Sequence, residues 1–141
     1  MAVRNLQRIF RPRHVAVLGA SNKKSSVASR VLKNLKHSGF PGPIYRVNPK
    51  YKRLGKEPCY ASVADLPGPC DLAVICTPAA TVPDLVRQCG EAGILGLVVL
   101  SAGFRETGAA GADLERVVRA EAAKFDGMRM IGPNCLGIIA P

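Results

Sequence analysis

The sequence predicts a doubly wound α/β domain, in which helices cover both faces of a parallel sheet of about five strands. Short apolar runs alternate along the chain with segments of helical period, and glycine or proline separates one from the next. The runs are apolar throughout, so both faces of each strand must be covered, as in a parallel sheet with crossover helices. The length of 141 residues suits one such domain and is too short for two.

The first half of the chain predicts a strand, a helix and a second strand. Residues 14–18 (HVAVL) are a β-branched apolar run that a glycine ends. Apolar residues at i, i+3, i+4 and i+7 predict a helix over residues 28–35, which a Gly- and Pro-rich stretch terminates. Residues 44–47 form the second strand, and an Asn-Pro pair leads from it into a basic loop over residues 50–56.

The second half continues the same alternation. Residues 72–76 (LAVIC) predict a third strand, and the helical spacing repeats over residues 82–89, with two glycines near its end. Residues 95–100 (LGLVVL) predict a fourth strand, residues 112–125 a third helix and residues 128–131 a fifth strand. The apolar residues of the third helix are Leu114, Val117, Val118 and Phe125.

Positive charge is concentrated in the first part of the chain. The formal net charge is +10, and residues 1–56 carry 14 Lys or Arg and no Asp or Glu. The remaining residues carry 6 Lys or Arg and 10 Asp or Glu. This asymmetry indicates an anionic partner, whether a nucleic acid, a membrane surface or a phosphorylated small molecule, and charge alone leaves the choice open. The alternative is a solvated basic face without a partner.

Composition excludes several classes of function. No stretch approaches the roughly 20 apolar residues that span a bilayer. Aromatic residues make up 5% and Trp is absent, so few rings could stack on single-stranded bases. The five cysteines have no CxxC spacing and only two histidines accompany them, so we expect no metal site.

Cysteine usage and the start of the chain bear on its compartment. Cys76 and Cys89 fall in apolar patterns, where cysteine is usually a small buried hydrophobe, and this favours a reducing, cytoplasmic setting. The Arg-rich opening also occurs in organellar presequences, but a predicted strand follows it at once. We therefore expect neither a presequence nor a secretory signal.

The loop after the first strand is a candidate anion site. Ligands of such sheets bind beyond the carboxyl ends of the strands, so the residues just after each strand are informative. This loop has a single glycine instead of the GxGxxG fingerprint, but it contains good turn and N-cap residues and two lysines at a helix start, where phosphate binds well. A capped helix with solvated lysines is the alternative. The candidate residues are Gly19, Ser21, Asn22, Lys23 and Lys24.

The loop after the second strand indicates the kind of nucleotide. NAD-binding sheets usually carry an acid near this point, whereas here Asn48, Pro49 and Lys50 follow the strand and further cations come after them. Cations suit a ribose that bears a phosphate, as in NADP or the 3′-phospho-ADP half of coenzyme A. We therefore favour a phosphorylated nucleotide over NAD.

The loops after the third and fourth strands consist of small residues, which let a ligand approach the backbone closely, although ordinary turns have the same composition. Their candidate binding residues are Thr77, Pro78, Ala79, Ser101, Ala102 and Gly103. No catalytic residue is expected. His14 precedes the first strand and His37 ends the first helix, both away from Cys135, and no two acids fall on these loops.

Residues 129–141 (RMIGPNCLGIIAP) closely resemble the end of the CoA-binding domain of the succinyl-CoA synthetase α subunit and of NDP-forming acyl-CoA synthetases, such as ADP-forming acetate:CoA ligase. Other segments resemble the same family in the same order, so the likeness covers nearly the whole chain. They are residues 17–21 (VLGAS), 47–51 (VNPKY), 59–63 (CYASV), 77–80 (TPAA) and 100–104 (LSAGF).

The resemblance implies a Rossmann-like fold that holds coenzyme A across the strand ends. Residues 21–24 would then contact the diphosphate and nucleotide, and Lys50 or a neighbour the phosphates. The two small-residue loops would line the adenine and pantetheine path. Pro133, Asn134 and Cys135 would shape the end where the thiol reacts.

One departure from the family pattern concerns glycine. Relatives usually carry glycine at or near Ser25 and Ala28, where it lets backbone approach phosphate and helix approach sheet. The resemblance therefore implies that this chain binds CoA more weakly than the fold suggests.

The resemblance also implies a place in a longer protein. In NDP-forming synthetases, acid, CoA and ATP give acyl-CoA, ADP and phosphate through a phosphorylated histidine on the following domain. We expect residues 1–141 to be a single N-terminal CoA-binding domain, inactive alone, that works with the remaining synthetase domains or with a partner subunit carrying the ATP-grasp site. Whether the full-length protein is an enzyme of this kind is open at this point.

Three alternatives stay open. The domain could belong to a synthetase-like protein lysine acetyltransferase, or be a stand-alone CoA- or nucleotide-binding regulatory module. A nucleic-acid-binding module that uses the basic first half is the alternative from another class, and it would bind duplex DNA with a steep salt dependence. We expect no specific nucleic acid and no membrane among the partners.

Overall fold

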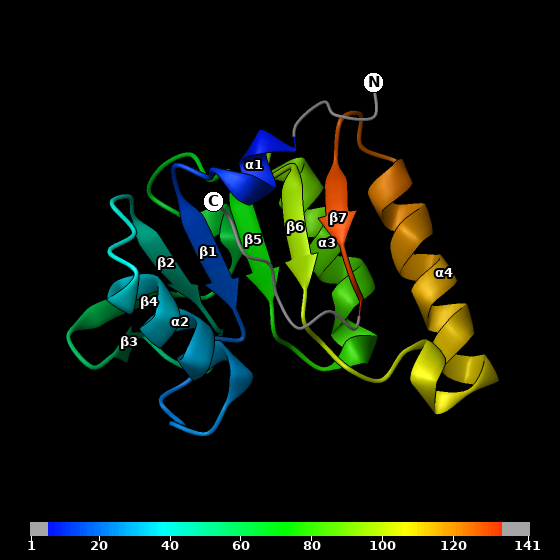
Figure 1. Cartoon of the computed structure of the whole chain (residues 1–141), viewed down its shortest axis with the longest axis horizontal. Helices are drawn as coiled ribbons and strands as arrows, with labels where there is room; N and C mark the ends of the chain where they lie inside the picture. The colour runs from blue at the N-terminus through cyan, green and yellow to red at the C-terminus, as the bar shows by residue number, and fades with distance from the viewer. Residues whose placement is uncertain (1–5, 134–141) are drawn as a thin grey trace.

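A seven-stranded sheet runs through the molecule, in the order β3-β4-β2-β1-β5-β6-β7 (Figure 1). This computed structural model describes residues 6–133. Neighbouring strands are parallel except for β3 and β4, which form an antiparallel hairpin. The strands are β1 (Val15–Leu18), β2 (Ile44–Val47), β3 (Arg53–Leu54), β4 (Glu57–Tyr60), β5 (Leu72–Ile75), β6 (Gly96–Val99) and β7 (Arg129–Ile131). The predicted doubly wound α/β class is confirmed, and each of the five predicted strands is present.

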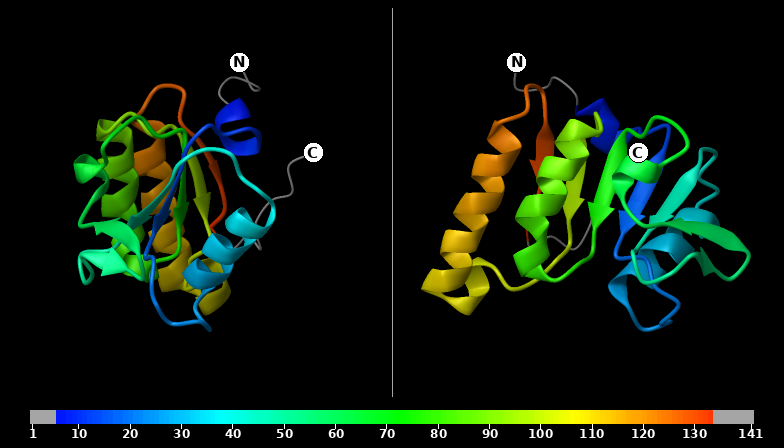
Figure 2. Two further views of the ribbon diagram at one scale, coloured as in Figure 1. Left: turned by 90° about the vertical axis from the view of Figure 1, so that its left-hand side faces the viewer. Right: turned by 180° about the vertical axis from the view of Figure 1, so that it is seen from behind.

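Helices cover both faces of the sheet (Figure 2). On one face α1 packs on β6 and α2 on β1, and on the other face α3 and α4 lie side by side. None of the helices within residues 6–133 has the length and apolar character needed to cross a bilayer. The helices are α1 (Gln7–Phe10), α2 (Val27–His37), α3 (Val82–Glu91) and α4 (Ala109–Ala123), with short 3₁₀ turns η1 (Val63–Asp65), η2 (Ala79–Thr81) and η3 (Arg105–Thr107).

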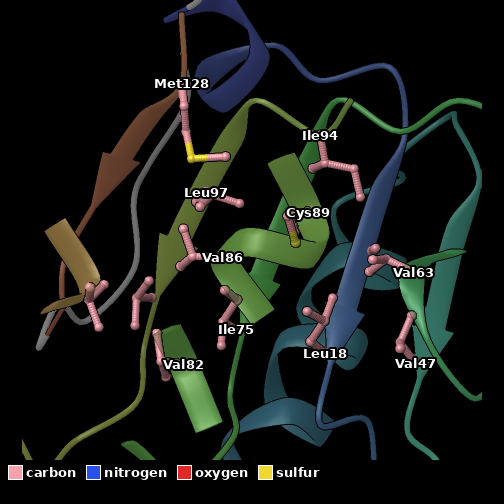
Figure 3. Packing of buried hydrophobic residues seen from close by; sticks show 14 of the residues in the cluster. Leu18, Val47, Val63, Ile75, Val82, Val86, Cys89, Ile94, Leu97 and Met128 are labelled. Carbon is pink, nitrogen blue, oxygen red and sulfur yellow. The ribbon is translucent and has the colours of Figure 1, made fainter. Parts of the chain in front are cut away.

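The core explains why the central strands are apolar throughout. Every residue of β1, β5 and β6 is buried, because helices lie on both sides of them. On one side, α3 presents Val82, Val86 and Cys89, spaced i, i+4, i+7, and each side chain has 0% exposure. They pack toward Ile75 of β5 and Leu97 of β6 (Figure 3). The predicted burial of Cys89 is confirmed.

The prediction of one basic loop over residues 50–56 is wrong. Arg53–Leu54 form β3, Gly55 turns the chain with a φ of +62°, and β4 follows as an unpredicted parallel neighbour of β2. Of the four residues of β4 only Cys59 is buried. A short edge hairpin with so little apolar surface has no apolar run, so periodicity does not detect it.

Helix boundaries also differ from the predictions. The predicted third helix begins earlier, at Ala109, and its Val117 is 47% exposed, so this residue is not part of the core. The buried stripe of α4 runs through Val118 and Glu115 instead. The unpredicted α1 buries Ile9, which is 2% exposed. One helical turn is too short for a periodic pattern.

The strand order determines where a ligand binds. From β1 the chain crosses to β2 on one side and later returns to β5 on the other side of β1. A crevice opens outside the carboxyl ends of two strands at such a reversal, and ligands of open α/β sheets bind there. In this domain the loops after β1 and β5 flank that point.

Candidate functional site

The loops after β1, β2 and β5 are joined at one edge of the sheet. The Asn48 side-chain amide donates to the Ala20 carbonyl, with Nδ2 and O 2.9 Å apart, which ties the β2 loop to the β1 loop. A Cβ placed on Gly19 would lie 2.9 Å from the carbonyl oxygen of Cys76 and 3.1 Å from Cγ2 of Thr77. With a φ of +89°, Gly19 therefore lets the β1 loop lie directly against the end of β5.

The loops after β5, β6 and β7 continue the same edge. A Cβ on Gly103 would lie 3.1 Å from the Cβ of Ala79, so the β6 and β5 loops touch. A Cβ on Gly132 would lie 2.4 Å from the carbonyl oxygen of Val99, at the end of β6. The structure thus brings the sequence-predicted positions from Gly19 to Pro133 to one edge, whereas Asn134 and Cys135 lie outside the described residues.

The β1 loop folds through its own hydroxyl groups. Ser21 Oγ accepts a hydrogen bond from the Lys23 amide at 3.0 Å. Ser26 is the N-cap of α2, and its Oγ accepts from the Ser29 amide at 3.1 Å. The Ser29 hydroxyl donates back to the carbonyl of Ser21 at 3.0 Å and to that of Lys23 at 2.6 Å. A serine cluster therefore shapes this turn, where a fingerprint loop would use glycines.

The same loop leaves donors free. Within residues 6–133, no acceptor is bonded to the backbone N–H of Asn22, Lys24 or Ser25. Lys23 and Lys24 are exposed, and neither forms an ion pair with a described carboxylate. Backbone amides at a helix start together with unpaired cations are groups that attract anions. The capped-helix alternative is therefore compatible with an anion site, because the cap uses only part of the available donors.

In the β2 loop, Asn48 forms hydrogen bonds with backbone groups, and the Lys50 side chain is unpaired among the described residues. The Asn48 backbone amide donates to the Tyr60 carbonyl at 2.9 Å, and its Oδ1 accepts from the Lys50 amide at 2.9 Å. Since its Nδ2 is bonded to the β1 loop, Asn48 is engaged at both ends of its side chain. Lys50 and Pro49 are exposed, and the Lys50 ammonium has no carboxylate partner among the described residues.

Sequence reasoning missed one residue of this loop. The Tyr51 hydroxyl donates to Oδ1 of Asn22 across 3.3 Å and so links the β2 loop to the β1 loop. A tyrosine in a basic, Pro-containing loop carries no signal that distinguishes it from a surface residue. Only the strand order, which places the two loops side by side, reveals the contact.

The β5 loop is braced by a hydroxyl pair. Thr81 donates to Oγ1 of Thr77 at 2.8 Å and to the carbonyl of Pro78 at 2.6 Å. In the β6 loop Ser101 is only 5% exposed and its Oγ lies 3.5 Å from the carbonyl oxygen of Ile75, so this hydroxyl faces the protein. Ala102 is exposed at the same edge.

Glu106 is a second residue that the sequence did not single out. Its Oε1 accepts hydrogen bonds from the backbone amides of Gly103 and, at 2.8 Å, Phe104. These two amides are therefore occupied by a protein carboxylate, whereas the amides of Asn22, Lys24 and Ser25 in the β1 loop have no acceptor among the described residues. Glutamate is not a characteristic turn residue, so the sequence carries no local signal for this contact.

His14 and His37 lie elsewhere. His14 directly precedes β1, at the opposite end of the sheet, and its Nδ1 is 3.8 Å from Oδ2 of the buried Asp71. His37 is the last residue of α2 and is exposed. Neither is close to the loops at the carboxyl ends. The described part of the site can therefore bind and orient a ligand, and it contains no nucleophile and base pair.

A Rossmann-like domain with a cationic, amide-rich loop at its switch point is a domain that binds a phosphate-bearing nucleotide. The chain belongs to the CoA binding domain family, whose model matches residues 13–141. The resemblance inferred from the motifs is thus confirmed, and coenzyme A is the cofactor of the family.

Several relatives of this chain are ADP-forming ligases. The chain is 46% identical over 134 residues to acetate-CoA ligase (ADP-forming) I of Archaeoglobus fulgidus, matching 95% of this chain and 19% of the relative. It is 42% identical over 135 residues to the α subunit of acetate-CoA ligase (ADP-forming) II of Pyrococcus furiosus, matching 95% of this chain and 29% of the subunit. The chain therefore spans between a fifth and a third of the length of these relatives.

Solved structures agree with the fold. A crystal structure from Pyrococcus horikoshii superposes with a TM-score of 0.88 at 43% identity, over 95% of this chain and 30% of that one. The dinucleotide-forming acetyl-coenzyme A synthetase 1 of Candidatus Korarchaeum cryptofilum, solved with phosphate and ADP, gives 0.86 at 39% identity over 94% of this chain and 28% of that one.

The described residues fit coenzyme A. The open amides of the β1 loop and the unpaired lysines match a diphosphate, and Lys50 adds a cation for a further phosphate. The small residues in the loops after β5 and β6 leave room beside the backbone for an uncharged part of the ligand. The individual contacts, and the weaker binding expected from Ser25 and Ala28, stay predictions.

Proposed function

We propose that this chain is the CoA-binding domain of an NDP-forming acyl-CoA synthetase, which converts acid, CoA and ATP to acyl-CoA, ADP and phosphate. The observation that carries the proposal is the β1 loop, where open amides and two unpaired lysines lie at the point of strand reversal. The ADP-forming ligases among the relatives support the reaction class. Because the chain spans a minor part of those proteins, the reaction belongs to the longer protein.

CoA lies along the edge with its nucleotide at the basic end. The diphosphate accepts hydrogen bonds from the β1 loop beside Lys23 and Lys24, and Lys50 pairs with the phosphates. Pantetheine crosses the uncharged β5 and β6 loops. The thiol then reaches the β7 loop at Pro133, where the chain leads on to the remaining two candidate positions. The strand order supports this direction, because the basic loop after β2 lies on one side of β1 and the small-residue loops after β5 and β6 lie on the other.

The domain holds the cofactor and leaves the chemistry to other parts of the protein. In this proposal the phosphorylated histidine and the ATP-grasp site come from the remaining synthetase domains or from a partner subunit. The α-subunit names of some relatives support the second arrangement. The relatives named as ligases favour a synthetase over a protein lysine acetyltransferase. A cytoplasmic location is part of the same proposal.

Calorimetric titration of residues 1–141 with CoA, dephospho-CoA, NADP and NAD tests the cofactor assignment. We expect CoA to bind most tightly and dephospho-CoA more weakly. Lys50→Ala should weaken CoA about threefold to tenfold and leave dephospho-CoA nearly unchanged, because it removes a partner of the 3′-phosphate, which dephospho-CoA lacks. Lys36→Ala, which removes the same charge from the last turn of α2, is the matched control.

Three outcomes would contradict the proposal. Preferred binding of NADP or NAD would indicate a nicotinamide-nucleotide domain. Equal effects of the two lysine substitutions would reduce the role of Lys50 to general surface charge. Acyl-CoA formation by residues 1–141 alone would show that the domain itself performs the chemistry.

A further inference from the structure

Glu115 is a buried carboxylate in the middle of α4. Its side chain is 8% exposed, although most glutamates of a surface helix point to water. Its Oε2 accepts hydrogen bonds from Arg105 at 3.0 Å and from Arg119 at 3.3 Å, both through Nη2, and Nε of Arg119 lies 3.4 Å away. Two guanidinium groups therefore neutralise a charge that would be costly to bury alone.

The two arginines belong to different parts of the candidate site. Arg105 begins η3, in the loop after β6, directly after the two amides that Glu106 holds. Arg119 lies one turn further along α4, and its Nη2 also donates to the carbonyl of Gly132 at 3.4 Å. Gly132 is in the loop after β7, directly before Pro133. One carboxylate thus connects the loops after β6 and β7.

The Gly132 carbonyl has little freedom to move toward β6. A Cβ at this residue would lie 2.4 Å from the carbonyl oxygen of Val99, so the backbone already contacts the end of β6. The Arg119 hydrogen bond holds it from the side of α4. No described contact of Glu115 reaches the loops after β1 and β2, where the nucleotide half of CoA is proposed to bind.

We propose that Glu115 is a positioning residue for the pantetheine and thiol end of the CoA site, which it sets through Arg105 and Arg119. The inference rests on the proposed function, because it assumes the direction of CoA along the edge. It requires the two ends of the site to respond differently to a change at Glu115.

The test compares a whole ligand with its nucleotide half. Glu115→Gln keeps the side-chain shape and removes the charge that holds both arginines. We expect its Kd for CoA to rise about fivefold to thirtyfold, and its Kd for 3′,5′-ADP, which lacks pantetheine, to change less than twofold. Asp113→Asn is the matched control, because it breaks an exposed pair with Arg116 on the same helix. It should change neither constant.

Hydrogen exchange of the free protein gives a readout without ligand. In Glu115→Gln the amides of residues 103–108 and 129–132 should exchange faster, while those of residues 19–26 keep their rate. Should that variant fail to fold, Arg119→Lys is the second test, because it keeps the positive charge beside Glu115 and removes the guanidinium that reaches Gly132. The same difference is expected, with a weaker affinity for CoA and a nearly unchanged affinity for 3′,5′-ADP.

The outcomes separate the two proposals. If the unmodified chain binds neither CoA nor 3′,5′-ADP, the proposed function and this inference both fall. If it binds both, and Glu115→Gln weakens both equally or weakens neither, the positioning role is wrong and the proposed function stands. Unchanged exchange of residues 129–132 would also overturn the positioning role.

Discussion

Replacing Gly19 with alanine should destabilise the domain through two separable effects. Gly19 has a φ of +89°, where an L-residue is strained by about 1–2 kcal/mol. The new methyl group would also lie 2.9 Å from the Cys76 carbonyl oxygen, closer than real Cβ contacts allow. Because that oxygen belongs to the backbone at the end of β5, relief requires the β1 loop to move. Overpacking of this kind costs about 1–3 kcal/mol.

Gly39→Ala separates the two effects. Gly39 also has a positive φ, +73°, but no atom lies within 4 Å of the position of its Cβ, so only the backbone strain remains. For a domain of this size about 1 kcal/mol lowers Tm by about 4 °C. We therefore expect a decrease of about 4–8 °C for Gly39→Ala and about 8–20 °C for Gly19→Ala, measured by circular dichroism under the same conditions.

The same pair of variants tests the site. At a temperature where both variants are folded, Gly19→Ala should bind CoA more weakly than the unmodified chain, because its β1 loop is displaced from β5. Gly39→Ala should bind CoA as the unmodified chain does. The reasoning is refuted if Gly19→Ala loses no more stability than Gly39→Ala. In that case the β1 loop would not lie against the end of β5.

Three further predictions concern stability and reactivity. Burial alone would raise the pKa of Asp71, but hydrogen bonds from the Arg13 side chain and backbone outweigh this effect and lower the pKa. Asp71 therefore stabilises the fold above about pH 4, and this contribution disappears as the pH falls further. In urea denaturation, Asp71→Asn should make the free energy of unfolding depend less on pH in the acid range, and an unchanged dependence would contradict the assignment. Burial raises the pKa of Cys70 to about 11 and of Cys89 to about 12, so iodoacetamide at pH 8 should modify each at least about 100-fold more slowly than in the unfolded chain, and equal rates in peptide mapping would exclude their burial. Gly111→Ala would place a methyl group 1.7 Å from a backbone carbonyl oxygen of the β6 loop and should cost about 3 kcal/mol in urea denaturation, whereas full stability would show that α4 does not pack there.

The central strands were predictable from the sequence because burial on both faces requires an unbroken run of apolar residues. Residues of β1, β5 and β6 are buried on both faces, so each strand is apolar along its whole length. The hairpin of β3 and β4 buries only Cys59, because it closes the edge of the sheet and faces water. Its pairing depends on Gly55 and on backbone hydrogen bonds, neither of which gives a periodic apolar signal.

The sequence predicted where in the fold the candidate residues lie, but it did not predict which way their side chains point. The parallel order places every loop after a predicted strand at one edge, so all the described candidates meet there. The Ser101 hydroxyl nevertheless faces the protein, and the Asn48 side-chain amide is bonded to the neighbouring β1 loop. Glu106 and Glu115 act on this edge from η3 and α4, and their role depends on packing that a single sequence does not encode locally.

The missing glycines have different consequences once their surroundings are known. Ala28, in the first turn of α2, is 2% exposed and packs in the core, so a methyl group is accommodated where a fingerprint glycine would let helix approach sheet. Ser25 lies in the exposed β1 loop, and its amide is one of those without an acceptor among the described residues. The expected loss of CoA affinity therefore reduces to the Ser25 position alone. There the side chain lies close to where phosphate would approach, and the serine cluster around Ser26 supplies the turn that a second glycine would otherwise give.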